Sequence, residues 1–219
     1  MFFQKDYILR MIEMMGDFMR RIGEILDDMQ RGRLLDEACR QHCGMDLQAA
    51  RGLSLESLAE LLAPKPRLML SEILYIQAMQ TSLPPEEREQ LFYRCGGLLL
   101  SLKEESLLSE LRHQRLGECL REAGGLFTPG ERMDAAAFFF QAEQFEQGED
   151  QLFAALDAAP RGEYPSLLGR GEALLSACLT VPGERLRAGG LPLEEVREGL
   201  AALKGRREAL ALGEGGRRA

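Results

Sequence analysis

The sequence predicts an all-α protein built of antiparallel helical hairpins packed in series. Three observations support this fold class. Leucine occurs 39 times, whereas valine, isoleucine and threonine together occur 11 times, and β-branched residues are those that strands favour. Apolar residues recur at alternating steps of three and four along most of the chain, as on one face of an α-helix. Proline and glycine stand between these stretches, where helices begin and end.

The first predicted helix covers residues 5–30. Its apolar residues form one broad stripe: Ile8, Met11, Ile12, Met15, Phe18, Met19, Ile22, Ile25, Leu26 and Met29. A seven-residue repeat within this stripe has the spacing of a coiled coil between two copies: Ile8, Met15, Ile22 and Met29. Two interpretations therefore stand. The stripe packs on its own domain, or it forms a homodimer through the first helix.

Three shorter helices are expected next, over residues 34–43, 54–62 and 68–80. Gly32 separates the first of them from the preceding helix, and Gly44 is placed to cap its end. Ser54 can cap the start of the second, and Pro64 with Pro66 ends it before the third begins. Together with the first helix these elements predict an N-terminal part of paired amphipathic helices over residues 1–83.

The C-terminal part, residues 84–207, is predicted to hold six helices: 84–103, 104–123, 129–145, 149–159, 164–180 and 193–204. The first of them begins at Pro84 and Pro85, followed by Glu86 and Glu87. Proline lacks the N–H that a helix start leaves unbonded, and acidic side chains favour the positive end of the helix dipole. Residues 208–219 are expected to form a mobile tail.

Composition restricts the partners and the compartment. The chain has 219 residues with 35 acidic and 27 basic side chains, a net charge of −8, so nucleic acid is not an expected partner. The basic excess near the C-terminus, from Lys204 to Arg218, indicates a solvated tail. No long uncharged segment is present, so neither a signal peptide nor a membrane span is expected. Five cysteines, an odd and scattered number, are typical of free thiols in the cytoplasm.

Residues 132–160 carry a motif of aromatic, small and apolar side chains: Phe139, Phe145, Gly148, Leu152, Ala155, Leu156 and Pro160. This segment resembles a tetratricopeptide repeat, although Ala135 and Ala136 stand where that motif usually has Leu-Gly, and Gly148 replaces alanine. The start of the chain, residues 6–13, resembles that of an uncharacterised bacterial family of tetratricopeptide-like proteins with no established activity. The resemblance implies hairpins stacked as a tetratricopeptide-like α/α array.

Such repeats usually present a groove lined by their first helices to a peptide or a partner helix. Mapped onto this chain, the resemblance places Met133, Ala137, Phe140 and Gln141 in that groove. Three consecutive phenylalanines cannot all occupy one core face of a helix, so Phe140 is of particular interest. The alternative interpretation is that Phe138 and Phe140 pack against the preceding and following hairpins.

Two groups of residues suggest metal or acid–base chemistry. Cys39, His42 and Cys43 lie on one helical turn and are ligand types that zinc prefers, but a structural zinc site needs a fourth ligand, and two cysteines on an apolar face also fit a core. Glu110 and His113 form a Glu-x-x-His step, which di-iron bundle proteins carry twice and this sequence carries once. His113 as a general base lacks an accompanying nucleophile motif.

The sequence also lacks the phosphate-binding, nucleophile-elbow and metalloprotease motifs. We therefore expect a non-catalytic protein–protein interaction scaffold that presents a helical-repeat groove to a protein or peptide partner, without a cofactor. The alternative is a small-ligand or metal-binding regulatory protein.

Overall fold

The computed structural model describes residues 28–80, 82–102 and 108–215. Within these ranges the secondary structure is α-helix with one short 3-10 turn, so the predicted all-α class is confirmed. The described residues divide into two compact units, one ending at Leu98 and the other starting at Leu99. The predicted homodimer seam, Ile8 to Met29, lies outside the described residues except at its last position.

Unit 1 contains five helices: α2 (Asp28–Cys43), α3 (Leu47–Gly52), α4 (Leu55–Leu61), α5 (Pro64–Ala78) and α6 (Pro85–Leu100), the last of which ends just beyond it. Helix α2 packs on α3 and α5, and almost every residue of α5 from Leu68 onward is buried. Helix α2 continues through Gly32, where we predicted a break, because one glycine in a helix costs only about 1 kcal/mol. One helix ends before Pro64 and another follows it, as predicted, but α5 begins at Pro64 rather than at residue 68, since the proline ring suits a first turn. Helix α3 was not predicted.

Side chains satisfy the ends of the short helices in unit 1. The Ser54 hydroxyl accepts a hydrogen bond from the Ser57 amide at 3.1 Å, as predicted, and Asp46 caps α3 in the same way. At the carboxyl ends, arginines donate to carbonyl groups that have no partner inside the helix. Arg67 reaches the carbonyls of Ala59 and Leu62 at 2.6 and 2.9 Å. Arg94 reaches those of Ala50 and Leu53 at 2.8 and 2.6 Å.

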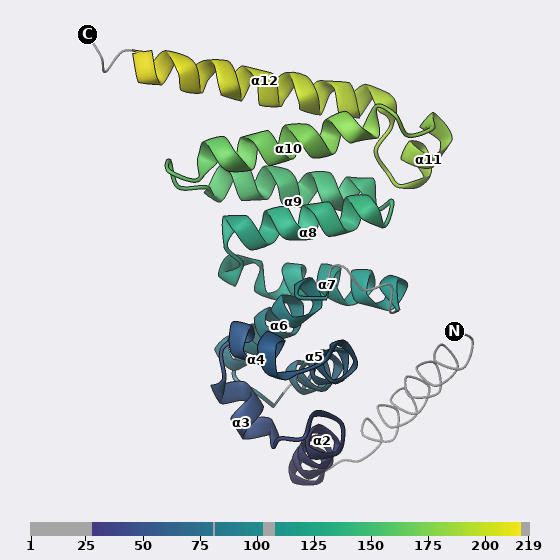
Figure 1. Ribbon diagram of the computed structural model, residues 1–219. Helices are drawn as coiled ribbons and strands as arrows, with labels where there is room; N and C mark the ends of the chain where they lie inside the picture. Colours follow the sequence, from purple (N-terminus) through teal and green to yellow (C-terminus); the bar gives the residue numbers. More distant parts are fainter. Residues whose placement is uncertain (1–27, 81, 103–107, 216–219) are drawn as a thin grey trace. The chain divides into compact units, whose positions relative to one another are not determined.

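Unit 2 contains α7 (Ser109–Ala123), the 3-10 turn η1 (Gly124–Leu126), α8 (Pro129–Gln141), α9 (Phe145–Ala158), α10 (Tyr164–Cys178), α11 (Gly183–Ala188) and α12 (Leu193–Gly215). Helices α8 and α9 form a tight hairpin, α10 packs on both, and α12 packs on α10, as the successive layers in Figure 1 show. A capping box between Thr128 and Glu131 starts α8. Helix α12 extends to Gly215, beyond its predicted end at residue 204.

Glycine stands at successive layer contacts of unit 2. A Cβ at Gly148 of α9 would lie 2.9 Å from Cδ2 of Phe140 in α8. At Gly171 of α10 it would lie 3.2 Å from Leu152 of α9, and at Gly199 of α12 it would lie 2.9 Å from Leu175 of α10. The missing side chains let adjacent helices approach closely while bulky neighbours fill the contact.

A segment between α10 and α12, residues 182–191, contains the short helix α11, which we did not predict; we call it the strap. The strap lies on the α8–α9 turn (Figure 1), where the Glu146 amide donates to the Gly189 carbonyl at 3.0 Å. Arg185 forms a two-point ion pair with Glu143, whose backbone has a φ of 60°. A Cβ at Gly189 would collide with the Glu143 carbonyl oxygen. The strap therefore fixes the turn by backbone contact and by charge.

Candidate functional site

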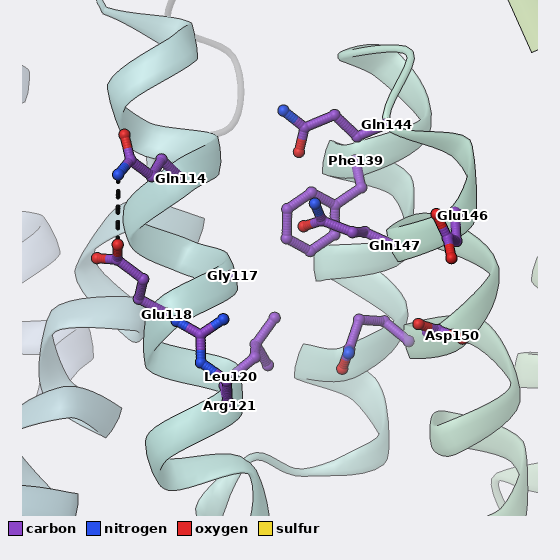
Figure 2. Close-up of a pocket in the computed structure, with 11 residues that line it drawn as sticks. Gln114, Gly117, Glu118, Leu120, Arg121, Phe139, Gln144, Glu146, Gln147 and Asp150 are labelled. Atoms are coloured by element: carbon purple, nitrogen blue, oxygen red, sulfur yellow. Dashed lines mark hydrogen bonds between the residues drawn. The ribbon is translucent and has the colours of Figure 1, made fainter. Parts of the chain in front are cut away.

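A cleft of about 610 Å³ opens in unit 2 between α7 and the α8–α9 hairpin. We call it the glutamine cleft, because four glutamines contribute to its walls: Gln114, Gln144, Gln147 and Gln151. Figure 2 shows the carboxamides of Gln144 and Gln147 pointing from the hairpin toward α7, with the Phe139 ring behind them. Gln144 lies just before α9, and Gln147 and Gln151 follow at steps of three and four. These three glutamines therefore lie on one side of that helix.

The amides of the cleft differ in their partners. Gln114 donates to Glu118 at 3.3 Å on its own helix, and Gln151 accepts from Arg132 at 2.9 Å. The Oε1 atom of Gln144 is buried and accepts no hydrogen bond from any described residue. A buried amide oxygen without a donor costs about 1–3 kcal/mol. Because this oxygen has almost no solvent-accessible surface, a bound group with an N–H or O–H would satisfy it after the carboxamide rotates toward the cleft.

The floor of the cleft is apolar and its rim is charged. Phe139 and Leu120 are buried beneath it. Gly117 exposes α7 backbone, and a Cβ there would approach Oε1 of Gln147 at 3.1 Å. Charged side chains of both signs stand at the rim: Glu118, Arg121, Glu146 and Asp150. The cleft thus offers neutral donors and acceptors over an apolar base, which suits a polar, uncharged chain.

The four residues predicted to line a groove are not presented together. Met133 is 0% exposed and Phe140 is 9% exposed, so neither offers a surface to a partner. Phe140 fills the interior of its own hairpin, with its ring centroid 6.1 Å from that of Phe145 and its edge against Gly148. The prediction for these two residues is corrected on that ground. Ala137 is half-buried and Gln141 is exposed.

A family model matches residues 2–208 and carries the description "Family of unknown function (DUF6483)". The chain belongs to the DUF6483 family. The expectation of an uncharacterised family is confirmed to that extent. No curated protein and no solved structure matches this DUF6483 chain.

The alternative interpretation of the three phenylalanines holds for Phe138. In this DUF6483 chain its ring lies against α7, 4.2 Å from the His113 ring and 4.9 Å from Cζ of Arg112. Burial, together with the charge of Arg112, lowers the pKa of His113 to about 4. Glu110 is exposed while His113 is buried. The imidazole is a neutral packing group with no open side for a substrate, so the geometry does not support a general base here.

The cysteine turn of α2 is also part of a core. All five cysteines of this DUF6483 chain are buried free thiols. The Cys43 thiol donates to the Pro66 carbonyl at 3.4 Å. The hydrogen bond between the two thiols lowers the pKa of Cys39 and raises that of Cys43, which burial raises further. In the described part of the chain no three His, Cys, Asp or Glu side chains are grouped to hold a metal ion, and His42 does not complete such a group.

The sequence contains an indication of the glutamine cleft that corresponds to no known motif. Gln144, Gln147 and Gln151 have helical spacing in the sequence, yet they are functional candidates only because α7 stands opposite. The residues of α7 that complete the cleft are about 30 positions earlier, a pairing that helical periodicity does not reveal.

No described helix has the length and apolar character that crossing a membrane requires.

Proposed function

We propose that this DUF6483 chain is a non-catalytic, cytoplasmic scaffold that holds an extended segment of a partner protein in the glutamine cleft. The observation that carries the proposal is the buried, unbonded Oε1 of Gln144 at the wall of this cleft. A peptide N–H is the most common donor that a protein partner can bring to such an acceptor.

The spacing of the amides supports an extended ligand. Residues three or four apart on a helix have Cβ atoms about 5–6 Å apart, and alternate residues of an extended chain are about 6.6 Å apart. Gln144, Gln147 and Gln151 therefore match every second residue of a peptide that runs along α9. Because a carboxamide both donates and accepts, it can bond to either kind of backbone group.

The likeness of α8–α9 to a tetratricopeptide repeat supports the same class of function. Phe139 and Phe145 are buried, and Phe140 packs closely against Gly148. Stacked hairpins of this kind create extended concave binding surfaces. We propose that the α8–α9 hairpin is a tetratricopeptide-like repeat. No described cluster of residues favours the alternative of a metal-binding regulator.

Site-specific photo-crosslinking in the producing cells tests the proposal. A photoreactive phenylalanine analogue replaces Arg121 or Glu146, at the rim of the cleft, in two variants, and Arg187 on the exposed strap in the control. We expect both cleft positions to yield the same adduct, joined to one short segment of another protein, and the control to lack it. The absence of an adduct, an adduct equally strong at Arg187, or an adduct with a second copy of this chain would each overturn the partner assignment.

The crosslinked segment, made as a peptide, then allows affinity to be measured. Loss of two backbone hydrogen bonds worth about 1 kcal/mol each should weaken binding about 30-fold, so we expect that change for a Gln144→Ala, Gln147→Ala variant. Gln141→Ala is the matched control, because this glutamine is exposed on α8 and does not line the cleft. Equal affinity of both variants would place the peptide elsewhere. Circular dichroism verifies that each variant is folded.

A further inference from the structure

A second groove in unit 2 lies between α9 and α12, with a volume of about 570 Å³. We call it the acidic groove. Five carboxylates stand along it: Glu149, Asp150 and Asp157 from α9, and Glu195 and Glu198 from α12. Its floor contains the Phe153 ring and three small residues, Ala154, Gly199 and Ala202. The groove therefore joins an apolar floor to walls of a single charge.

Most of this charge is not neutralised within the described part of the chain. Four of the five carboxylates form no ion pair there: Glu149, Asp150, Glu195 and Glu198. Burial, helped by the charges of Glu195 and Asp150, raises the pKa of Glu149 to about 7. The side chains therefore repel one another, and a cation between them would relieve that repulsion.

One end of the acidic groove already holds a guanidinium group. Arg206 of α12 donates to Oδ1 of Asp157 at 2.7 Å, and its Cζ lies 5.4 Å from the centroid of the Phe153 ring. This internal residue combines a charge-assisted hydrogen bond with a cation–π contact. These contacts show that the groove can hold a guanidinium group between a carboxylate and an aromatic ring. The described residues that line the rest of the groove include further carboxylates but no second guanidinium group.

The dimensions of the groove suit a helix. From Glu149 to Asp157 the groove follows about 12 Å of helix axis, which is two helical turns. The small side chains of Ala154 and Ala202 on the floor allow another helix axis to approach closely. Basic residues at steps of three and four on such a helix would be about 5–6 Å apart and would face both acidic walls.

We propose that the acidic groove binds a cationic amphipathic helix of a partner protein, with arginine or lysine side chains placed between the carboxylates of α9 and α12. The inference rests on the proposed scaffold function and adds a second binding surface to it. A nucleic acid does not fit, because the groove is negatively charged.

Fluorescence anisotropy with synthetic peptides tests the inference on the full chain. The probe is an alanine-based helical peptide with arginines at positions i, i+4 and i+7, and its control has the same composition with the arginines distributed around the helix. We expect the striped peptide to bind at least tenfold more tightly. The variant Glu149→Gln, Glu195→Gln, Glu198→Gln should weaken that binding at least tenfold.

A matched variant separates the groove from net charge. Glu163→Gln, Glu184→Gln, Glu208→Gln removes three exposed carboxylates outside the acidic groove and should change affinity less than twofold. Equal weakening by both triple variants, equal binding of both peptides, or stronger competition by spermine than by the striped peptide would each overturn the inference.

The Gln144→Ala, Gln147→Ala variant distinguishes this inference from the proposed function. It should bind the striped peptide as wild type does, because neither glutamine lines the acidic groove. Striped-peptide binding that depends on the three glutamates, in a chain that yields no crosslink in the glutamine cleft, would refute the cleft proposal and leave the acidic groove standing. A crosslink in the glutamine cleft, together with striped-peptide binding that does not depend on the three glutamates, would refute the acidic-groove inference alone.

Discussion

His113 illustrates how burial changes the meaning of a titratable residue. In the sequence it resembles a candidate base, four positions after the start of a helix that also carries Glu110. In the structure its ring is packed against Phe138 and is 6% exposed. Its role is therefore to complete the contact between α7 and α8 in a neutral form. A residue with this role should influence stability, and it should do so only over a particular range of pH.

We expect the stability of the protein to fall between pH 6.5 and 4 because of His113. Its pKa in the folded protein is about 4, whereas in the unfolded chain it is about 6.5. Below pH 6.5 the unfolded chain therefore binds a proton that the folded chain does not, which costs up to about 2 kcal/mol at pH 5.

The variant His113→Gln keeps an N–H donor but does not titrate. Urea unfolding at pH 7 and pH 5 should give a smaller loss of stability for the variant than for wild type. Identical losses would mean that His113 is protonated or exposed in the folded protein.

At the scale of elements, arginine closes several helix ends. Besides Arg67 and Arg94, Arg88 donates to the Ala78 carbonyl at 3.1 Å, Arg112 to that of Leu102 at 2.6 Å and Arg132 to that of Gly124 at 2.6 Å. Each of these carbonyls lies at or just past the end of a helix, where helical partners run out. Short helices have a large share of such groups, so unit 1 depends on these side chains.

Arg94 is the best position at which to test this dependence, because it bonds to two carbonyls that flank the end of α3. We expect Arg94→Met to destabilise the protein by about 2–3 kcal/mol, since two partly buried acceptors lose a charged donor. The control Arg40→Met changes an exposed arginine whose one ion pair with a described residue is with Asp36 on its own helix, and it should cost less than about 0.5 kcal/mol. Chemical denaturation measures both. A loss no larger than that of the control would show that water replaces the cap.

The strap allows a second test at this scale. We expect Gly189→Ala to destabilise unit 2 by about 1–3 kcal/mol, because the new methyl group would collide with the Glu143 carbonyl and with Phe145. Hydrogen exchange of the Glu146 amide, which bonds to Gly189, should accelerate. Gly183→Ala is the control in the same segment, since a Cβ there meets nothing within 4 Å. Unchanged exchange in Gly189→Ala would mean that the strap is not held at the turn.

The elements that the sequence predicted well are those with local signals. Ser54 marks a helix start through its side-chain hydroxyl and Pro85 through its missing N–H, and the structure agrees. The short helices α3 and α11 contain too few residues to produce a periodic pattern. The burial of Met133 and Phe140 depends on α9, so it was not visible in α8 alone. Both grooves likewise need two helices that are distant in the sequence.

At the scale of the whole molecule, each unit has its own interior. In unit 2, one described core cluster of 15 buried residues is contributed by α8 to α12, and the core of unit 1 centres on α5. A segment of about 120 residues is long enough to bury a core of its own. The two units therefore meet the physical requirement for folding as separate bodies.

We expect residues 99–219 to fold without the rest of the chain. Circular dichroism of this fragment should give a helical spectrum and a cooperative thermal transition. A fragment that is helical but melts without a cooperative transition would show that unit 2 needs unit 1 to complete its packing.

The strap also has a consequence for the order of events during synthesis. The α8–α9 hairpin consists of consecutive residues and can form as soon as Ala158 leaves the ribosome. Gly189 follows about 30 residues later, which at 5–20 residues per second is roughly 2–6 s. During that interval the turn at Glu143 has neither the Arg185 ion pair nor the Gly189 carbonyl. Until the strap has been synthesised, the α8–α9 turn of the nascent hairpin lacks these contacts and is accessible to chaperones and proteases.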